Sequence, residues 1–187
     1  MDGRKERGAL RRNALMSAAV DLAAQHGISA VTHRAVALSS GVSLASVTYH
    51  YPTIAALKEA MFEWIGNQVI TTMENAIHEG ESQHLSPEDT AGALAYELCK
   101  EHSELVVMLL QLLVAAQSDP QLRLVSEHLN TRAEAIVQTA VGAPDAPAVV
   151  AAMQGVMLRA LSRENEQAEW ARNTVCTLVG RYTHFRQ

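Results

Sequence analysis

The chain has 187 residues, which suits one large domain or a small domain joined to a larger one. Apolar residues make up 48% of the sequence but aromatic residues only 4%, so the core must consist mainly of Ala, Leu, Val and Met, which favours helices over sheets. The net charge of −5, taken alone, argues against a nucleic-acid partner.

The charge is unevenly distributed along the chain. Residues 1–50 carry a net charge of +3, with five of their six Lys and Arg residues in the basic segment 4–12, whereas the remaining residues carry −8. Because physiological salt screens charges beyond about 8 Å, an acidic body does not prevent a basic end from binding phosphates. Segment 4–12 therefore either follows phosphates or the minor groove of a nucleic acid, or is a solvated, disordered tail.

Several classes of protein are not expected from this sequence. It has no long uncharged apolar run of membrane-spanning length, and Cys99 and Cys176 are isolated thiols that suit a reducing compartment. It also has no G-x-S-x-G, H-E-x-x-H or P-loop motif and no Cys or His pair at metal-ligand spacing. We therefore expect a cytoplasmic protein that is not an enzyme and holds no cofactor or metal.

Helical periodicity and capping residues predict about nine helices and no strand. Thr32, Ser43 and Thr53 are typical N-caps, and Ser86-Pro87 and Asp119-Pro120 combine a cap with a first-turn proline. The apolar segment at 104–117 is predicted to be buried on all sides. The expected helices are 4–26, 33–39, 44–50, 54–80, 87–100, 104–117, 120–141, 147–161 and 165–184.

The segment 33–50 holds two short predicted helices separated by a turn at Ser40-Gly41-Val42. A short helix with small and polar side chains, held across another short helix, is the arrangement that reads a DNA groove. We therefore predict an N-terminal three-helix helix-turn-helix DNA-binding domain (1–52) and a larger C-terminal helical domain (53–187) for ligand binding and dimerisation.

The same region resembles the DNA-binding domain of TetR-family transcriptional regulators over about residues 8–62. The resemblance implies a homodimer in which the third helix of each subunit enters the major groove of a palindromic operator. A small organic ligand in the larger domain would change the spacing of the two reading heads. The matching positions are Gly27, Thr32, Val36-Ala37, Gly41-Val42-Ser43, His50-Tyr51 and Leu57.

The resemblance also suggests roles for individual residues. It places Thr32, His33 and Arg34 near the DNA backbone, although Arg34 is equally suited to a guanine. Tyr49 and His50 fall at positions that contact phosphates, and packing of Tyr49 between helices is the alternative. The reading helix would present Ser43, Leu44, Ala45, Ser46 and Thr48 to the bases.

The sequence departs from the family pattern at three positions. Ala45 stands where many members have Gly, Thr48 where they have Tyr, and Ile54 where most have Lys. Loss of the lysine removes a common phosphate contact. We expect Lys58, one helical turn later, to replace part of it together with the free amides at the start of its helix.

Two further surfaces are predicted in the larger domain. Apolar walls with a few polar groups suit a pocket for a small organic ligand, whereas the same residues can simply form core. A stripe along the last two helices suits a four-helix bundle with a second copy, in which Gly155 allows close approach; the alternative is that the stripe packs inward on the predicted helix 120–141. The pocket candidates are Met61, Trp64, Gln68, Tyr96, Cys99, Met108, Gln111 and Leu112; the dimer candidates are Val149, Ala152, Met153, Gly155, Val156, Ala160, Thr174, Val175, Leu178 and Tyr182.

The predicted function is therefore that of a sequence-specific DNA-binding regulator. A repressor that a small organic effector releases from its operator is favoured over an activator. The alternative is a DNA-binding regulator without such an effector, controlled by a partner protein or by oxidation of Cys99 or Cys176.

Overall fold

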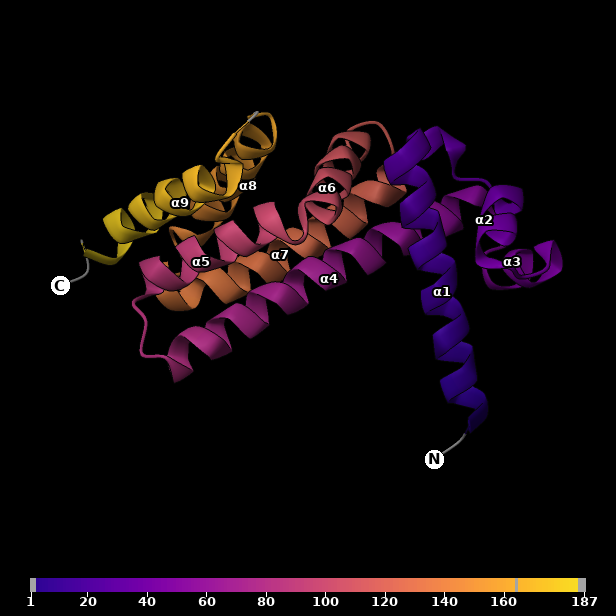
Figure 1. The fold of residues 1–187 in the computed structure, drawn as a ribbon, viewed down its shortest axis with the longest axis horizontal. Helices are drawn as coiled ribbons and strands as arrows, with labels where there is room; N and C mark the ends of the chain where they lie inside the picture. The colour runs from indigo at the N-terminus through magenta and orange to yellow at the C-terminus, as the bar shows by residue number, and fades with distance from the viewer. Residues whose placement is uncertain (1–2, 164, 185–187) are drawn as a thin grey trace. The chain divides into compact units, whose positions relative to one another are not determined.

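The computed structural model describes residues 3–163 and 165–184. These residues form nine α-helices and one short 3₁₀ helix and contain no strand, which confirms the predicted all-α fold (Figure 1). The elements are α1 (Gly3–His26), η1 (Ile28–Ala30), α2 (His33–Ser40), α3 (Leu44–His50), α4 (Ile54–Ser82), α5 (Pro87–Lys100), α6 (Ser103–Ala115), α7 (Pro120–Val141), α8 (Ala146–Leu161) and α9 (Gln167–His184).

The chain divides into two compact units. The N-terminal unit comprises Met1–Ile65 and the C-terminal unit comprises Gly66–Gln187, so α4 contributes residues to both. Each helix is amphipathic enough to bury one face within its own unit, and each unit has its own set of fully buried side chains.

The helices of the N-terminal unit begin where side chains can satisfy free backbone N–H groups. The N–H of Ala35 donates to Oγ1 of Thr32 at 3.1 Å, and the N–H of Ala56 donates to Oγ1 of Thr53 at 3.1 Å. These bonds confirm that α2 and α4 start at the predicted caps, since each bond replaces a partner that the first helical turn lacks.

The turn between α2 and α3 depends on a glycine. Gly41 lies in the left-handed region at φ 69° and ψ 20°, where a side chain would be strained. Its N–H bonds back to the carbonyl of Leu38, and the N–H of Val42 bonds to the carbonyl of Ala37, so the last carbonyls of α2 are satisfied. This turn sets the direction in which α3 leaves α2.

The core of the N-terminal unit joins all four of its helices. Val36 of α2 and Val47 of α3 are completely buried, as are Leu15 of α1 and Phe62 of α4. Because α3 has only seven residues, it cannot be stable alone, and its conformation depends on this burial. Other buried members are Met16, Ala19, Ala23, Leu57, Met61 and Ile65.

In the C-terminal unit, α5 packs along α9, and α8 packs on α7 and α9. Gly92 permits the first of these contacts, because a Cβ at Gly92 would lie 3.1 Å from the carbonyl oxygen of Arg172 and 3.2 Å from Cβ of Cys176. No single described helix is both long and apolar enough to cross a membrane; only α7 and α8 together reach that length and composition, and they are bent by 109° at their break.

One expectation about the C-terminal unit differs from the structure. Segment 104–117 was expected to be buried all round, but α6 leaves Val107 and Val114 exposed, the latter at 72%. These residues share a face with Glu104 and Gln111, which are also exposed. The two polar residues mark this face at helical spacing, and apolar composition alone did not reveal it.

Candidate nucleic-acid interface and ligand cavities

The short helix α3 presents most of its surface outward. Ser43 caps it, with the N–H of Ser46 donating to Oγ of Ser43 at 3.2 Å. Val47 is completely buried and anchors the helix, whereas Leu44, Ala45 and Thr48 are exposed. Val47 therefore fixes which face of α3 points into the unit and which face is free to meet another molecule.

The free face of α3 offers apolar groups and single hydrogen-bonding groups rather than charged ones. The Thr48 hydroxyl donates to the carbonyls of Leu44 and Ala45 at 3.1 and 3.2 Å, which leaves its methyl group and an acceptor lone pair available. Leu44 is 44% exposed and supplies a second apolar group. Such groups suit thymine methyls and single hydrogen bonds to base edges rather than bidentate contacts.

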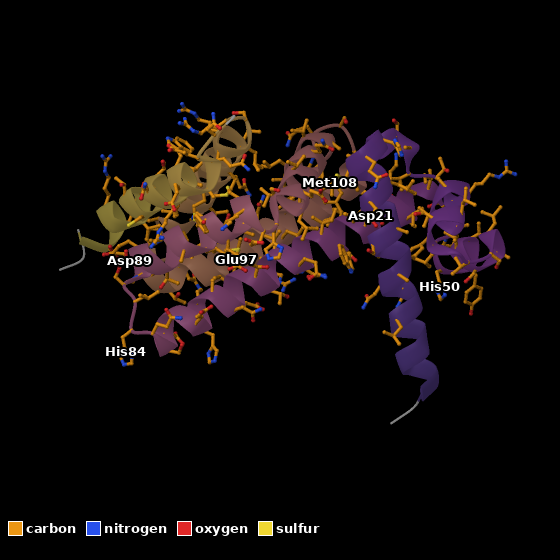
Figure 2. All side chains as sticks on the ribbon, in the orientation of Figure 1. Asp21, His50, His84, Asp89, Glu97 and Met108 are labelled. Carbon is orange, nitrogen blue, oxygen red and sulfur yellow. The ribbon has the colours of Figure 1, made fainter. Side chains whose placement is uncertain are left out.

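The aromatic end of α3 separates into exposed and packed residues. Tyr49 is 82% exposed, so the alternative that it packs between helices does not apply. Its ring meets His50 edge to face, with centroids 5.4 Å apart, and His50 lies at the end of α3 (Figure 2). Tyr51 is half-buried, and this burial raises the pKa of its hydroxyl; Arg12 lowers that pKa and Glu63 raises it.

His33 has a structural partner that sequence analysis did not anticipate. Its Nε2 lies 2.7 Å from the carbonyl oxygen of Tyr51, and since a carbonyl only accepts, Nε2 donates. The bond ties the start of α2 to the end of α3. His33 was predicted to approach DNA, but this half-buried ring is engaged inside the unit.

Basic side chains around α3 are few. Arg34 is exposed at the start of α2, and Lys58 is half-buried in the second turn of α4. Ile54, which stands where most family members have a lysine, is 40% exposed. Arg12 is exposed, whereas the side chains of the other basic residues in segment 4–12 lie outside the described residues.

An exposed leucine in the N-terminal unit escaped sequence analysis. Leu38 is 84% exposed in the last turn of α2, while its neighbours Val36 and Ala37 are buried. The helical phase set by those two residues places Leu38 outward, so the signal was present in the periodicity. It adds an apolar group to the surface that α2 and α3 share.

Described residues of the C-terminal unit line at least two cavities. The first, of about 90 Å³, has an almost wholly apolar lining from α4 to α8. The second, of about 280 Å³, is lined by α4, α5, α7, α8, α9 and the loop before α5. None of the eight residues predicted for a pocket lines either cavity: Met61, Trp64, Gln68, Tyr96, Cys99, Met108, Gln111 and Leu112.

On α6, the residues predicted for the pocket and the residues that line the first cavity lie on different faces of the helix. On α6, Met108 and Leu112 are buried while their neighbours Leu109, Leu110 and Leu113 face the first cavity. Gln111 is exposed instead. Successive residues on a helix point about 100° apart, so the choice of face depends on packing partners that the sequence of an apolar helix does not specify.

The polar groups of the first cavity come from Asn130 of α7 and Gln154 of α8. Nε2 of Gln154 donates to Oδ1 of Asn130 at 2.9 Å. Among the described residues, Nδ2 of Asn130 and Oε1 of Gln154 have no further hydrogen-bond partner, so they remain available to a ligand or to water. Sequence analysis missed this pair; its only signal was two amides on otherwise apolar helical faces.

The residues predicted for a dimer face do not share one environment. Val149, Ala160 and Val175 are completely buried within the unit, and Met153 lines both cavities. Gly155 is exposed, and a Cβ built on it would meet nothing within 4 Å. The remaining candidates are half-buried: Ala152, Val156, Thr174, Leu178 and Tyr182.

The two thiols lie in surroundings that make them less reactive. Cys99 is completely buried, with Sγ 3.5 Å from Sδ of Met157, and burial raises its pKa. Partial burial and the nearby Asp89 and Glu88 carboxylates raise the pKa of Cys176. Fewer thiolates form at neutral pH when the pKa is raised. Within the described residues, no group of His, Cys, Asp and Glu is arranged to hold a metal ion.

An exposed short helix, anchored by one buried valine and held by a glycine turn across a second short helix, is the arrangement of helix-turn-helix DNA-binding proteins. The sequence comparisons agree. The model for bacterial regulatory proteins of the tetR family matches residues 15–61, and the model for the tetracyclin repressor-like C-terminal domain matches residues 85–181, more than half of the chain. The chain belongs to the TetR family of transcriptional regulators, which are DNA-binding proteins rather than enzymes.

Solved structures are similar over most of the chain. SCO7518 of Streptomyces coelicolor A3(2) is 22% identical over 92% of this chain and 98% of that one, with a TM-score of 0.79, which shows a shared fold. The multidrug binding protein EbrR, complexed with ethidium, is 26% identical over 90% of this chain and 98% of its own, with a TM-score of 0.74. No curated protein matches the sequence at a significant level.

Proposed function

We propose that the protein is a homodimeric repressor that leaves a palindromic operator when a small organic effector occupies the C-terminal unit. The observation that carries the DNA-binding part is the free surface of α3, where Leu44, Ala45 and Thr48 are exposed while Val47 is buried. A seven-residue helix with this face outward fits the major groove.

Operator recognition by this face depends on few strong base contacts. Helix α3 carries no Arg, Lys, Asn or Gln, the residues that make bidentate contacts with bases. We expect specificity from apolar contacts to thymine methyls by Leu44, Ala45 and the Thr48 methyl, from hydrogen bonds by Ser46 and Thr48, and from DNA shape. Leu38, exposed beside α3, extends the apolar contacts.

Contacts to the DNA backbone come from groups around this face. Arg34 and Tyr49 are exposed and reach outward, and His50 is half-buried beside Tyr49. Thr32 and Ser43 already accept backbone N–H groups as caps, so their hydroxyl hydrogens remain available to phosphate oxygens. Lys58 supplies the charge that Ile54 lacks, and Lys58→Ala should lower the salt dependence of binding by about one charge.

Effector binding is assigned to the cavities of the C-terminal unit. A mainly apolar wall with one amide pair, Asn130 and Gln154, suits a small organic molecule with a hydrogen-bonding group. EbrR, a multidrug binding protein of similar fold, has been crystallised with ethidium and with proflavin, which supports this assignment. Helix α4 lines both cavities and also supplies Ile54 and Lys58 to the N-terminal unit, so it offers a covalent route for the signal.

A dimer contact is assigned to the outer face of α8. Gly155 and its neighbours one turn away, Ala151, Ala152 and Leu158, leave small and apolar groups uncovered, with Leu158 59% exposed. An exposed glycine within a helix costs about 1 kcal/mol relative to alanine, and close approach of a second backbone explains its use. Gly155→Arg should yield a monomer in sedimentation, whereas a dimer that persists would exclude this face.

Control by thiol oxidation, the alternative effector-free mechanism, has less support. Cys99 is completely buried, and the pKa of both thiols is raised. We therefore expect peroxide to leave operator binding unchanged both in the protein as it stands and after both cysteines are replaced with serine.

The decisive experiment is footprinting of the full chain on the DNA upstream of its own gene. We expect two protected half-sites related by a twofold axis, with protection lost in Tyr49→Ala and retained in Tyr182→Phe. Adding organic molecules that raise the melting temperature should remove the protection, because a ligand at about 100 times its dissociation constant adds about 2.7 kcal/mol of stability. A single unsymmetrical protected patch would exclude the proposed binding mode.

A further inference from the structure

The two cavities of the C-terminal unit are separated by side chains that belong to both. Met73 of α4, Leu94 of α5 and Met153 of α8 line the first cavity and also the second. No other described residue appears in both linings. The boundary between the cavities therefore lies at three apolar residues.

The cavity linings form continuous stripes along the helices that pass this boundary. Residues three or four apart on a helix share a face, and the α4 stripe continues from the first cavity into the second without a change of face. From Gly66 to Glu81 the stripe extends about 22 Å at the rise of an α-helix. Its members on α4 are Gly66, Val69, Ile70, Met73, Ile77 and Glu81.

The boundary is made of side chains that can move. Methionine has three rotatable bonds and adapts its shape readily, so Met73 and Met153 can change rotamer without moving a helix. Met153 is only half-buried, which leaves it room to swing. Opening at these two residues would join the cavities into a single elongated site.

The two ends of this elongated site differ in exposure. Around the second cavity, Glu81, Leu85 and Thr139 are exposed and form its mouth. In the first cavity, Ile70 and Val106 are each only 3% exposed. A ligand with a charged end and an apolar chain would therefore keep its charged end at the mouth and its chain beyond the methionines, where Asn130 and Gln154 bond to each other and the rest of the lining is apolar.

The mouth carries a single kind of charge. Glu81 is the only charged residue among the described residues that line either cavity, and none of these residues is Lys, Arg or His. His84, in the loop after α4, points away from the helices (Figure 2). A ligand carboxylate would find no cation at the mouth, whereas a ligand ammonium group would find the Glu81 carboxylate.

We propose that the two cavities form one site for an elongated cationic amphiphile, with its ammonium group at Glu81 and its chain passing between Met73 and Met153 into the first cavity. This inference names the chemical class of the effector and so rests on the proposed function.

The first test compares ligands that share one chain but differ in charge. Dodecyltrimethylammonium, dodecanol and dodecanoate are titrated into the full-length protein by calorimetry, the two ionic ligands below their micellar concentrations and dodecanol below its solubility limit. We expect dodecyltrimethylammonium to bind more tightly than dodecanol, and dodecanoate to bind most weakly. Equal or tighter binding of dodecanoate overturns the proposal.

The role of Glu81 is tested with a matched pair of variants on the same helix. Glu81→Gln should weaken dodecyltrimethylammonium binding by about fivefold, the upper range for a partly solvated ion pair, and leave dodecanol unchanged. Glu74→Gln removes an equally exposed carboxylate that lines neither cavity, and it should change neither affinity. Equal effects of the two variants would overturn the assignment of the charged end to Glu81.

Passage through the boundary is tested by chain length. Butyltrimethylammonium is too short to reach beyond the methionines, so Met153→Trp should leave its binding unchanged while weakening dodecyltrimethylammonium at least tenfold. In the unchanged protein each added methylene should improve affinity about threefold to fourfold until the first cavity is filled. If Met153→Trp weakens both ligands equally, or neither, the cavities do not act as one site.

DNA binding is measured separately, so that two kinds of failure can be told apart. Release of the protected operator by a neutral or anionic molecule, without binding of the cationic probes, would retain the proposed repressor and overturn the cationic site. Binding of the cationic probe with the predicted variant effects but without operator release would retain the site and overturn its role in the proposed function.

Discussion

The two units of the protein form their proposed functional surfaces in different ways. In the N-terminal unit the surface is the outside of α3, and one buried residue, Val47, decides which side that is. In the C-terminal unit the surface is an interior one, shared among the six helices α4 to α9, and it depends on how each helix is rotated. A short motif therefore determines the first surface, whereas the second emerges only from packing.

The reading helix and the cavity walls also differ in what stabilises them. The reading helix has seven residues and derives its stability from the caps, the Gly41 turn and a few fully buried contacts. The cavity walls derive theirs from longer helices that bury several apolar residues each. Damage to one of the few N-terminal contacts should therefore affect DNA binding disproportionately.

The largest effect is expected from Phe62→Ala in the core of the N-terminal unit. Phe62 is completely buried, so its removal should cost about 3–5 kcal/mol of unfolding free energy and abolish DNA binding. Leu112→Ala, equally buried in the C-terminal unit, should cost about 2–5 kcal/mol and leave DNA binding detectable at low temperature. Denaturant titration measures the unfolding free energy of the two variants, and gel-shift assays measure their DNA binding. If both variants lose DNA binding equally at the same stability, the two units do not differ in this respect.

A smaller effect is expected at the turn. Gly41→Val places a β-branched residue at φ 69° and should cost about 1–3 kcal/mol, with loss of operator binding but unchanged ligand binding in the C-terminal unit. Gly41→Asn is the control, because asparagine tolerates this conformation better, and it should retain most operator affinity. If both variants bind DNA equally well, the turn geometry does not position α3.

These differences explain how much the sequence could predict. Caps and turns are local, so Thr32, Ser43, Thr53, Ser86 and Asp119 located the helix starts to within a residue or so. Exposure of Leu44, Ala45 and Thr48 on α3 was implied by the resemblance to the family, which itself rests on a local motif. The cavity lining could not be predicted in this way, because α6 is apolar on several faces and its rotation depends on α7 and α8.

The role of His33 shows the same limit at a single residue. Its position at the start of α2 is correctly predicted by the Thr32 cap, yet its partner is the Tyr51 carbonyl, 18 residues away in sequence. Contacts at that separation depend on the angle at which α3 leaves the Gly41 turn. They cannot be obtained from the order of residues along one helix.

Removing one cap from each unit should give effects of about 1 kcal/mol. Ser43→Ala and Ser86→Ala each delete a side-chain oxygen that accepts a backbone N–H at 3.2 Å, so both should lower stability by about 0.5–2 kcal/mol. Only Ser43→Ala should also weaken operator binding, because Ser43 starts the reading helix. Thermal melts measure the stability of each variant, and gel shifts measure its operator binding. If Ser86→Ala weakens operator binding as much as Ser43→Ala does, the loss of binding follows from the loss of stability alone.

The smallest effect concerns alkaline pH and again separates the two units. Burial raises the pKa of Tyr51 above its ordinary value near 10, and burial also raises the pKa of Cys99 and Cys176 above the ordinary thiol value near 8.5. For each group the unfolded chain loses its proton first. The stabilising contribution is thus complete below the ordinary pKa and is lost as pH rises through the folded pKa.

Melting temperatures measured between about pH 8 and pH 11 should therefore fall in two stages, the first from the thiols and the second from Tyr51. Tyr51→Phe should flatten the upper stage, and Cys176→Ser should reduce the lower one. Tyr49→Phe is the control for Tyr51, since an 82% exposed ring lacks the burial that raises the pKa of Tyr51. If Tyr49→Phe flattens the upper stage as much as Tyr51→Phe does, burial of Tyr51 is not the cause of the fall in melting temperature at high pH.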